Sequence, residues 1–285
     1  MRERACQFGS HGGLVGILCE PDSVAPGAPA VVLANVGLNH RVGPSRSWVE
    51  CARALARDGF PSLRFDLSGL GDSEPRSDTL SDTERAARDL EQALDFLCER
   101  DVARRFVLVG NCSGVDSLHT VAGRDPRVEG AVYIDGYAYR NAAFLWRWML
   151  LRWFEPNRWL RYARFRGRYK SPAGTADRPV WKREIPTREE FQRDLEALVA
   201  RGVRLLFVFT GGMGLHYNHA SQFYDCFGHR GTVAVSYHPR ADHLLTSASE
   251  RADVIGRICD FMRRAFHAGE AGLCEAAAAQ RESTR

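Results

Sequence analysis

A cysteine between two glycines is the residue of this sequence best suited to do chemistry. Residues 106–109 are a short apolar run, and Gly110-Asn-Cys112-Ser-Gly114 follows them before a helix-like segment begins. Glycines two positions before and after a central residue, between a strand and a helix, are typical of a nucleophile elbow. Such a turn is tight, so it forces the central residue into strained backbone angles. The spacing therefore predicts Cys112 as a nucleophile raised above a sheet.

Two other interpretations of this turn are open. Free cysteine is often a small buried core residue without any reactivity. Ser113, one position later, could be the nucleophile instead, although a serine at the start of a helix is usually an N-cap. We favour Cys112, because the elbow spacing centres on it and because the positive end of the following helix favours a thiolate.

Strand-like and helix-like segments alternate on both sides of this turn. Residues 4–19 are expected to form two strands joined by a turn. Further apolar runs predict buried strands at residues 30–34, 61–65, 128–134, 203–209 and 232–237. Helical spacing of apolar residues predicts helices at residues 45–58, 83–100, 188–201, 220–227 and 247–265. The alternation predicts an α/β fold with a mostly parallel sheet that carries helices on both faces.

The composition fits one large globular domain, or one domain with a substantial insertion. The chain has 285 residues, of which 45% are hydrophobic and 26% are charged. Its eight cysteines include no Cys-x-x-Cys pair, so we expect a reducing cytoplasm rather than secretion, and no zinc site. No apolar stretch is long enough for a transmembrane segment, and the N-terminus has no apolar signal core. A net charge of +4 is too small to indicate nucleic-acid binding by the whole chain.

Two further motifs, taken with the elbow, resemble the α/β-hydrolase superfamily. One is Asp66-x-x-Gly-x-Gly-x-Ser73, whose Asp66 and Ser73 are expected to hold a loop rather than to catalyse. The other is the polar, glycine-bearing loop at residues 37–43. Within the superfamily, this loop and residues 63–66 look like a serine-aminopeptidase-like (S33-like) branch. Members of that branch often lie beside polyketide and polysaccharide assembly genes.

The resemblance implies the remaining catalytic groups. The superfamily usually has Gly-x-Ser-x-Gly, so Cys112 is a departure, although dienelactone-hydrolase-like members share it. The family order is nucleophile, acid, histidine, and His243 follows the last core strand and precedes the final helix as that order requires. His243 is therefore expected to be the general base. The oxyanion hole is expected to combine the backbone N–H of Ser113 with that of Leu38.

The acid of the triad is open at this point. The family usually places an aspartate after the strand at residues 203–209, but residues 210–218 contain no carboxylate. Asp135, at the end of the preceding strand, is the alternative that some hydrolases of this fold use. Asp225, the amide of Asn218, and the absence of any third member are further options, since a thiol is more acidic than a hydroxyl and tolerates a weak orienter.

The middle of the chain differs from the rest in charge. Residues 140–170 hold nine Arg or Lys residues against one acid, Glu155, and nine aromatic residues. The resemblance implies that such an insertion covers the active site, so we divide the chain into a core of residues 1–136 and 187–285 and an inserted helical lid of residues 137–186. The lid is either an amphipathic cap or a surface whose aromatics line an acyl pocket and whose basic face receives an acyl carrier protein or coenzyme A. Binding to a membrane surface and binding to nucleic acid are lesser alternatives.

These features together predict a cytoplasmic α/β hydrolase. It would take an acyl group from an ester or thioester through a covalent thioester on Cys112, with His243 as general base. Cysteine suits transfer between thioesters, so thioesterase or acyltransferase activity is favoured over amide hydrolysis. No metal or other cofactor is expected. The alternative from another class is a non-hydrolytic binding or scaffold protein with the same fold and a degenerate triad.

Overall fold

Eight strands form one sheet in the order β1-β2-β4-β3-β5-β6-β7-β8 in the computed structural model of the chain, which describes residues 1–153, 183 and 185–267. The strands are β1 (Arg2–Phe8), β2 (Leu14–Glu20), β3 (Ala30–Leu33), β4 (Ser62–Phe65), β5 (Phe106–Asn111), β6 (Val128–Ile134), β7 (Arg204–Thr210) and β8 (Val233–His238). β2 runs antiparallel to both β1 and β4, and all the other neighbouring pairs are parallel. The sheet is therefore mostly parallel, as predicted.

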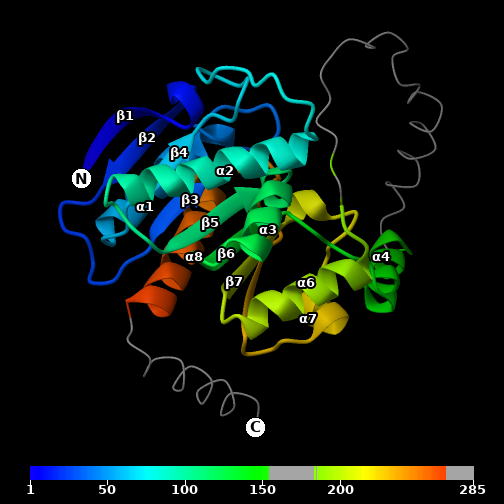
Figure 1. Cartoon of the computed structure of the whole chain (residues 1–285). Helices are drawn as coiled ribbons and strands as arrows, with labels where there is room; N and C mark the ends of the chain where they lie inside the picture. The colour runs from blue at the N-terminus through cyan, green and yellow to red at the C-terminus, as the bar shows by residue number, and fades with distance from the viewer. Residues whose placement is uncertain (154–182, 184, 268–285) are drawn as a thin grey trace.

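Helices cover both faces of this sheet (Figure 1). α1 (Ser47–Arg57) and α8 (Ala248–Phe266) pack on one face. The other face is covered by α2 (Asp82–Glu99), α3 (Gly114–Arg124), α6 (Arg188–Ala200) and α7 (Gln222–Phe227). Three short 3-10 turns also occur in the described part of the chain: η1 (Ser10–Gly12), η2 (Pro44–Arg46) and η3 (Gly211–Met213). The predicted strands and helices are all present, with ends within two residues of those expected from the sequence.

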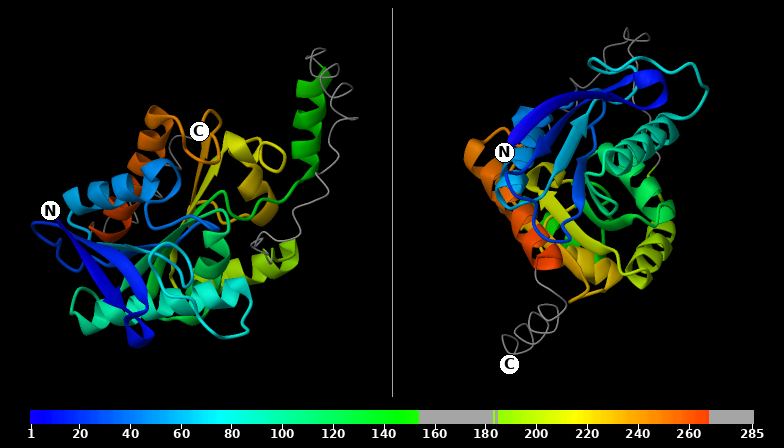
Figure 2. Two further views of the ribbon diagram at one scale, coloured as in Figure 1. Left: turned by 90° about the horizontal axis from the view of Figure 1, so that it is seen from above. Right: turned by 60° about the vertical axis from the view of Figure 1, so that its left-hand side comes forward.

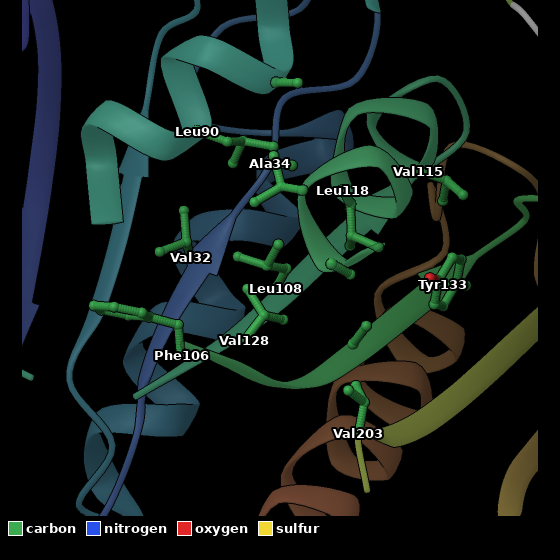
Figure 3. Close-up of a cluster of buried hydrophobic side chains, with 14 of the residues drawn as sticks. Val32, Ala34, Leu90, Phe106, Leu108, Val115, Leu118, Val128, Tyr133 and Val203 are labelled. Carbon is green, nitrogen blue, oxygen red and sulfur yellow. The ribbon is translucent and has the colours of Figure 1, made fainter. Parts of the chain in front are cut away.

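The core consists of two apolar layers, one on each face of the sheet. Successive residues of a strand point to opposite faces, so Val32 and Leu108 pack under α2 and α3, whereas Val31 and Val107 pack under α1 and α8. Figure 3 shows part of the first layer, with labelled side chains from or next to β3, β5 and β6, from the helices α2 and α3, and from Val203 just before β7. Burial on both faces explains why the central strands are continuous apolar runs in the sequence.

Local signals fix the ends of several helices. α2 begins where the Ser81 side chain accepts a hydrogen bond from the Glu84 N–H. α6 begins with a reciprocal capping box between Thr187 and Glu190. After α1 the chain reverses at Gly59, whose φ of 83° is in the left-handed region that favours glycine. These helices pack against the sheet, and the candidate site lies at the carboxyl ends of its parallel strands.

The predicted lid is described only in part. α4 (Ala142–Trp153) follows β6 and projects away from the sheet (Figure 2). Residues 154–182 and 184, which include Glu155 and most of the basic and aromatic residues of the insertion, lie outside the described residues. Among the helices that are described, none has the length and apolarity to cross a membrane.

Candidate active site

The elbow has the backbone geometry that its glycines predict. Cys112 follows β5 with a φ of 53°, an unusual value for a residue with a side chain. A Cβ atom at Gly110 would lie 2.8 Å from the carbonyl oxygen of Gly114, and a Cβ at Gly114 would lie 2.3 Å from the carbonyl oxygen of Asn35. Neither position can carry a side chain without moving the backbone. The strained turn therefore presents the half-buried Cys112 above the carboxyl end of β5.

Asp135 lies at the equivalent end of β6 and is fully buried. Its Oδ1 accepts a hydrogen bond from the Thr210 N–H at 2.7 Å, and its Oδ2 accepts one from the Thr210 hydroxyl at 2.6 Å. The Nδ1 atom of His243 lies 2.9 Å from the same Oδ2. Two donors from one threonine thus fix the carboxylate, and the carboxylate in turn orients the imidazole ring.

The other candidates for the acid do not contact His243. Asp225 accepts a hydrogen bond from the Ser221 hydroxyl at 2.9 Å on α7. The Asn218 amide donates to the carbonyl of Phe144 at 3.2 Å and accepts from Arg147 at 3.1 Å, so it anchors the base of α4. Of the options that the sequence leaves open, the structure therefore brings only Asp135 to the histidine.

The thiol and the imidazole shift each other's ionisation. Burial alone would raise the pKa of the Cys112 thiol, but its hydrogen bond to His243 and the positive charges of His243 and Arg183 outweigh burial and lower the pKa. The hydrogen bonds to Asp135 and to Cys112 raise the pKa of His243 to about 10. Both shifts favour a thiolate beside an imidazolium, and the thiolate is the reactive form of cysteine.

Ser113 connects the elbow to the loop that follows β3. Its side chain is buried, and its hydroxyl accepts a hydrogen bond from the Gly37 N–H at 2.6 Å. Its backbone N–H points to the sulfur of Cys112. The next N–H along the loop, that of Leu38, finds no acceptor in the described part of the chain. The two N–H groups expected for the oxyanion hole therefore lie on segments that Ser113 ties together.

An ion pair holds the same loop from its other end. The backbone N–H of Arg41 donates to Asp66 at 2.6 Å, and its guanidinium contacts both Asp66 and Asp72. Asp66 is fully buried, and the Ser73 hydroxyl donates to its carbonyl at 2.7 Å. Asp66 and Ser73 thus hold the loop, as the sequence suggested, and the partner that the sequence did not reveal is Arg41.

Two glycines after β7 explain why the usual acid position is empty. A Cβ at Gly211 would lie 2.1 Å from the carbonyl oxygen of Pro239, and a Cβ at Gly212 would lie 2.4 Å from the backbone nitrogen of His243. The loop that carries His243, residues 239–243 (the histidine loop), therefore packs directly on the backbone of Gly211 and Gly212. A carboxylate side chain at Gly212 would displace His243, and one at Gly211 would displace the backbone at Pro239. Asp135 approaches from the neighbouring strand instead.

The sequence did not reveal an ion pair beside Cys112. Asp116, buried in the first turn of α3, accepts hydrogen bonds from Nε and Nη2 of Arg183 at 2.8 and 2.7 Å. The Nη1 atom of Arg183 lies 4.0 Å from the sulfur of Cys112. In the sequence, this ion pair could be suspected only from Asp116, which lies four residues after the cysteine. Nothing in the sequence links Arg183 to the site, because it is 71 residues from Cys112. The described residues contain no group of His, Cys, Asp or Glu side chains that could hold a metal ion.

Comparisons with known proteins agree with this fold. The solved structures that resemble the chain include an esterase from Pyrococcus furiosus, at 15% identity, 94% coverage of this chain, 92% of that one and a TM-score of 0.60. An alpha-beta serine hydrolase homologue from Coxiella burnetii is 12% identical, the match covers 91% of this chain and 97% of that one, and the TM-score is 0.58. A dienelactone hydrolase from Anabaena variabilis is 14% identical, the match covers 92% of this chain and 97% of that one, and the TM-score is 0.54.

Because the sequence identities are low, these structural likenesses show a shared fold and nothing more. No curated protein matches the chain in sequence. The sequence does match the family model described as the Alpha/beta hydrolase family, over residues 24–269. That match includes the elbow, the buried aspartate and the histidine loop. The chain therefore belongs to the alpha/beta hydrolase family.

Proposed function

We propose that the protein is an acyl-ester or thioester hydrolase, or an acyltransferase, that works through a covalent thioester on Cys112. The observation that carries the proposal is the unbroken series of contacts from Cys112 to His243 to Asp135 at the carboxyl edge of the sheet. A nucleophile, a base and an orienting acid in hydrogen-bond contact are the arrangement that acyl transfer requires.

The chemistry proceeds in two balanced steps. The Cys112 thiolate attacks the acyl carbonyl, and the N–H groups of Ser113 and Leu38 hold the negative oxygen that forms. The bond to the leaving alcohol or thiol then breaks, and His243 gives that group its proton. In the second step neutral His243 takes a proton from water, the resulting hydroxide attacks the thioester, and the Cys112 thiolate leaves. An alcohol or thiol in place of water would give acyl transfer.

The substrate class, the branch of the family and the role of the insertion are further parts of the proposal. Because the covalent intermediate is itself a thioester, its energy is close to that of a thioester substrate, so we favour thioesters over amides. The motifs at residues 37–43 and 63–66 support the serine-aminopeptidase-like branch, and with it a role in a polyketide or related acyl pathway. We further propose that residues 137–186 act as a lid whose basic face receives an acyl carrier protein or coenzyme A, in the cytoplasm.

A scaffold function with a degenerate triad has less support. The sequence allowed a scaffold function because the loop after β7, where the family usually places the acid, contains no carboxylate. The buried Asp135 supplies the missing contact to His243. A binding protein that had lost its activity would have no need for a fixed acid and a thiol whose pKa is lowered by its neighbours.

The test is to trap the intermediate. We expect a short-chain acyl thioester of N-acetylcysteamine to add one acyl mass to the wild-type protein and none to Cys112→Ala, as measured by intact-protein mass spectrometry. Peptide mapping should place the adduct on Cys112. Turnover without an adduct, retained by Cys112→Ala, would rule out the covalent route, and the absence of both turnover and adduct with esters and thioesters would favour the scaffold function.

A further inference from the structure

The ion pair beside the nucleophile leaves one side of a guanidinium free. Asp116 binds Arg183 through both carboxylate oxygens, which occupy Nε and Nη2. Such a two-point pairing fixes the plane of the guanidinium as well as its position. The remaining terminal nitrogen, Nη1, is the one that lies 4.0 Å from the sulfur of Cys112. The free donors of Arg183 therefore face the atom that becomes acylated.

The partner that fixes Arg183 is itself fixed. Asp116 is fully buried in the first turn of α3, two residues after the elbow glycine. The hydroxyl of Tyr137, which is also buried, makes a hydrogen bond with the same carboxylate. A buried carboxylate that holds three hydrogen bonds has little freedom to move. Asp116 thus holds Arg183 in place, and the Arg183 side chain remains 23% exposed.

Acylation changes what Arg183 faces. In the resting enzyme the charge of Arg183 acts on the Cys112 sulfur and favours the thiolate. Once the sulfur carries an acyl group it is neutral, and the N–H groups of Nη1 lose their anionic neighbour. Half-buried cationic donors without an acceptor are costly. An acyl group with its own negative oxygen near the carbonyl would replace the charge that the thiolate has lost.

We propose that Arg183 is a specificity-determining residue that selects acyl groups with a carboxylate one or two carbons beyond the reacting carbonyl, such as the malonyl group. The inference rests on the proposed covalent chemistry at Cys112 and adds the class of acyl group. Asp116 is a positioning residue in this arrangement, since it acts through Arg183. His243 and Asp135 serve the proton transfers and not this selection.

The first test needs no turnover. Iodoacetate and iodoacetamide both alkylate a thiolate, but only iodoacetate carries a carboxylate. We expect the ratio of their rates at Cys112 to be about tenfold to a hundredfold higher in the wild type than in Arg183→Met, the range expected for hydrogen bonds to a charged group. Changes in the thiolate fraction affect both reagents equally and cancel in the ratio. Arg183→Lys, which keeps the charge without the fork, and Asp116→Asn should give intermediate ratios.

The second test uses thioesters. Malonyl and butyryl thioesters of N-acetylcysteamine differ in charge at similar length. We expect the wild type to form the malonyl adduct faster and Arg183→Met to lose that preference. The melting temperature of Arg183→Met should fall, because the buried Asp116 loses its ion-pair partner, but a cooperative unfolding transition should be retained. An alkylation ratio that is equal in the wild type and Arg183→Met would overturn the selection. Equal adduct formation from both thioesters would overturn it while leaving the covalent chemistry intact, and no adduct from either would overturn both.

Discussion

The Nδ1 atom of His243 lies 2.9 Å from Oδ2 of Asp135, although the two residues are 108 positions apart in the chain. Asp135 leaves the sheet at the end of β6, and the pairing of Ile134 with Val208 places it beside the end of β7. From there its carboxylate reaches both Thr210 and the histidine loop. One strand thus supplies the carboxylate that contacts His243, and the neighbouring strand supplies the threonine that orients this carboxylate.

Removing the charge of Asp135 should disable the histidine without unfolding the protein. Asp135→Asn keeps the size of the side chain, but an amide cannot stabilise the imidazolium, so we expect kcat on an acyl thioester to fall by one to several powers of ten. Thr210→Val removes only the hydroxyl donor, and its kcat should fall by about tenfold, as for the loss of one hydrogen bond. A wild-type rate in Asp135→Asn would exclude Asp135 as the acid.

The helices and strands, and the positions of Cys112 and His243 in the candidate site, could be predicted from the sequence because their signals are local. The central strands are buried on both faces and so appear as apolar runs. Cys112 is marked by the glycines that flank it, and the close approach of Gly114 to the carbonyl of Asn35 shows why that spacing is obligatory. His243 is marked by its place between the last strand and the last helix.

The remaining parts of the site have no local signal. Thr210 acts on Asp135 across 75 residues, and Arg183 acts on Asp116 across 67. Such contacts depend on which strands are neighbours and on where the chain returns after the insertion. The glycines at 211 and 212 were visible in the sequence, but their reason, the close approach of the histidine loop, needs the fold.

The two neighbouring side chains of the elbow should respond differently to alanine. Cys112→Ala should abolish turnover of an acyl thioester while the fold is retained. Ser113→Ala removes the acceptor for the Gly37 N–H, so the loop of the oxyanion hole should loosen and kcat should fall by about tenfold. Circular dichroism would confirm that both variants fold. Should Ser113→Ala be inactive and Cys112→Ala active, the nucleophile would be Ser113.

The opposite pKa shifts of Cys112 and His243 predict how stability depends on pH. Unfolded imidazole titrates near pH 6.5 and unfolded thiol near pH 8.5, whereas in the fold the pKa of His243 is raised to about 10 and that of Cys112 is lowered. The raised pKa contributes stability that is complete below about pH 6.5 and is lost as the pH rises through about 10. The lowered pKa contributes stability that is complete above about pH 8.5 and is lost as the pH falls.

The two contributions oppose each other up to about pH 8.5, and above that pH only the loss from His243 remains. The free energy of unfolding should therefore fall between about pH 8.5 and 10 more steeply in the wild type than in the double variant Cys112→Ala, His243→Gln. Urea unfolding at a series of pH values measures this difference, in which the titration of other groups cancels. Parallel curves for the two proteins would mean that the pair is not ionised in the fold.

The basic insertion predicts a salt effect if the acyl group arrives on an acidic carrier. Charge steering raises the rate of encounter and is screened over about 10 Å at 0.1 M salt. We expect kcat/KM for a carrier-bound substrate to fall as salt rises, and kcat/KM for a small neutral thioester to stay nearly constant. Arg161→Glu with Arg164→Glu, at positions outside the described residues, should weaken only the carrier-bound reaction. An equal loss on both substrates would instead assign these arginines to the fold or the pocket.

The glycines that let the histidine loop approach β7 should be needed for activity rather than for folding. A Cβ at Gly212 would lie 2.4 Å from the backbone nitrogen of His243, so Gly212→Ala must push the histidine away from Asp135. A displacement of about 1 Å can cost a hundredfold in rate, and we expect a fall in kcat of that order with a cooperative unfolding transition retained. Gly256→Ala in α8 is the matched control, because a Cβ there meets nothing within 4 Å. The control should keep full activity and gain about 0.5–1 kcal/mol of stability from the better helix former, and equal kcat values for the two variants would show that the histidine loop can move without harm.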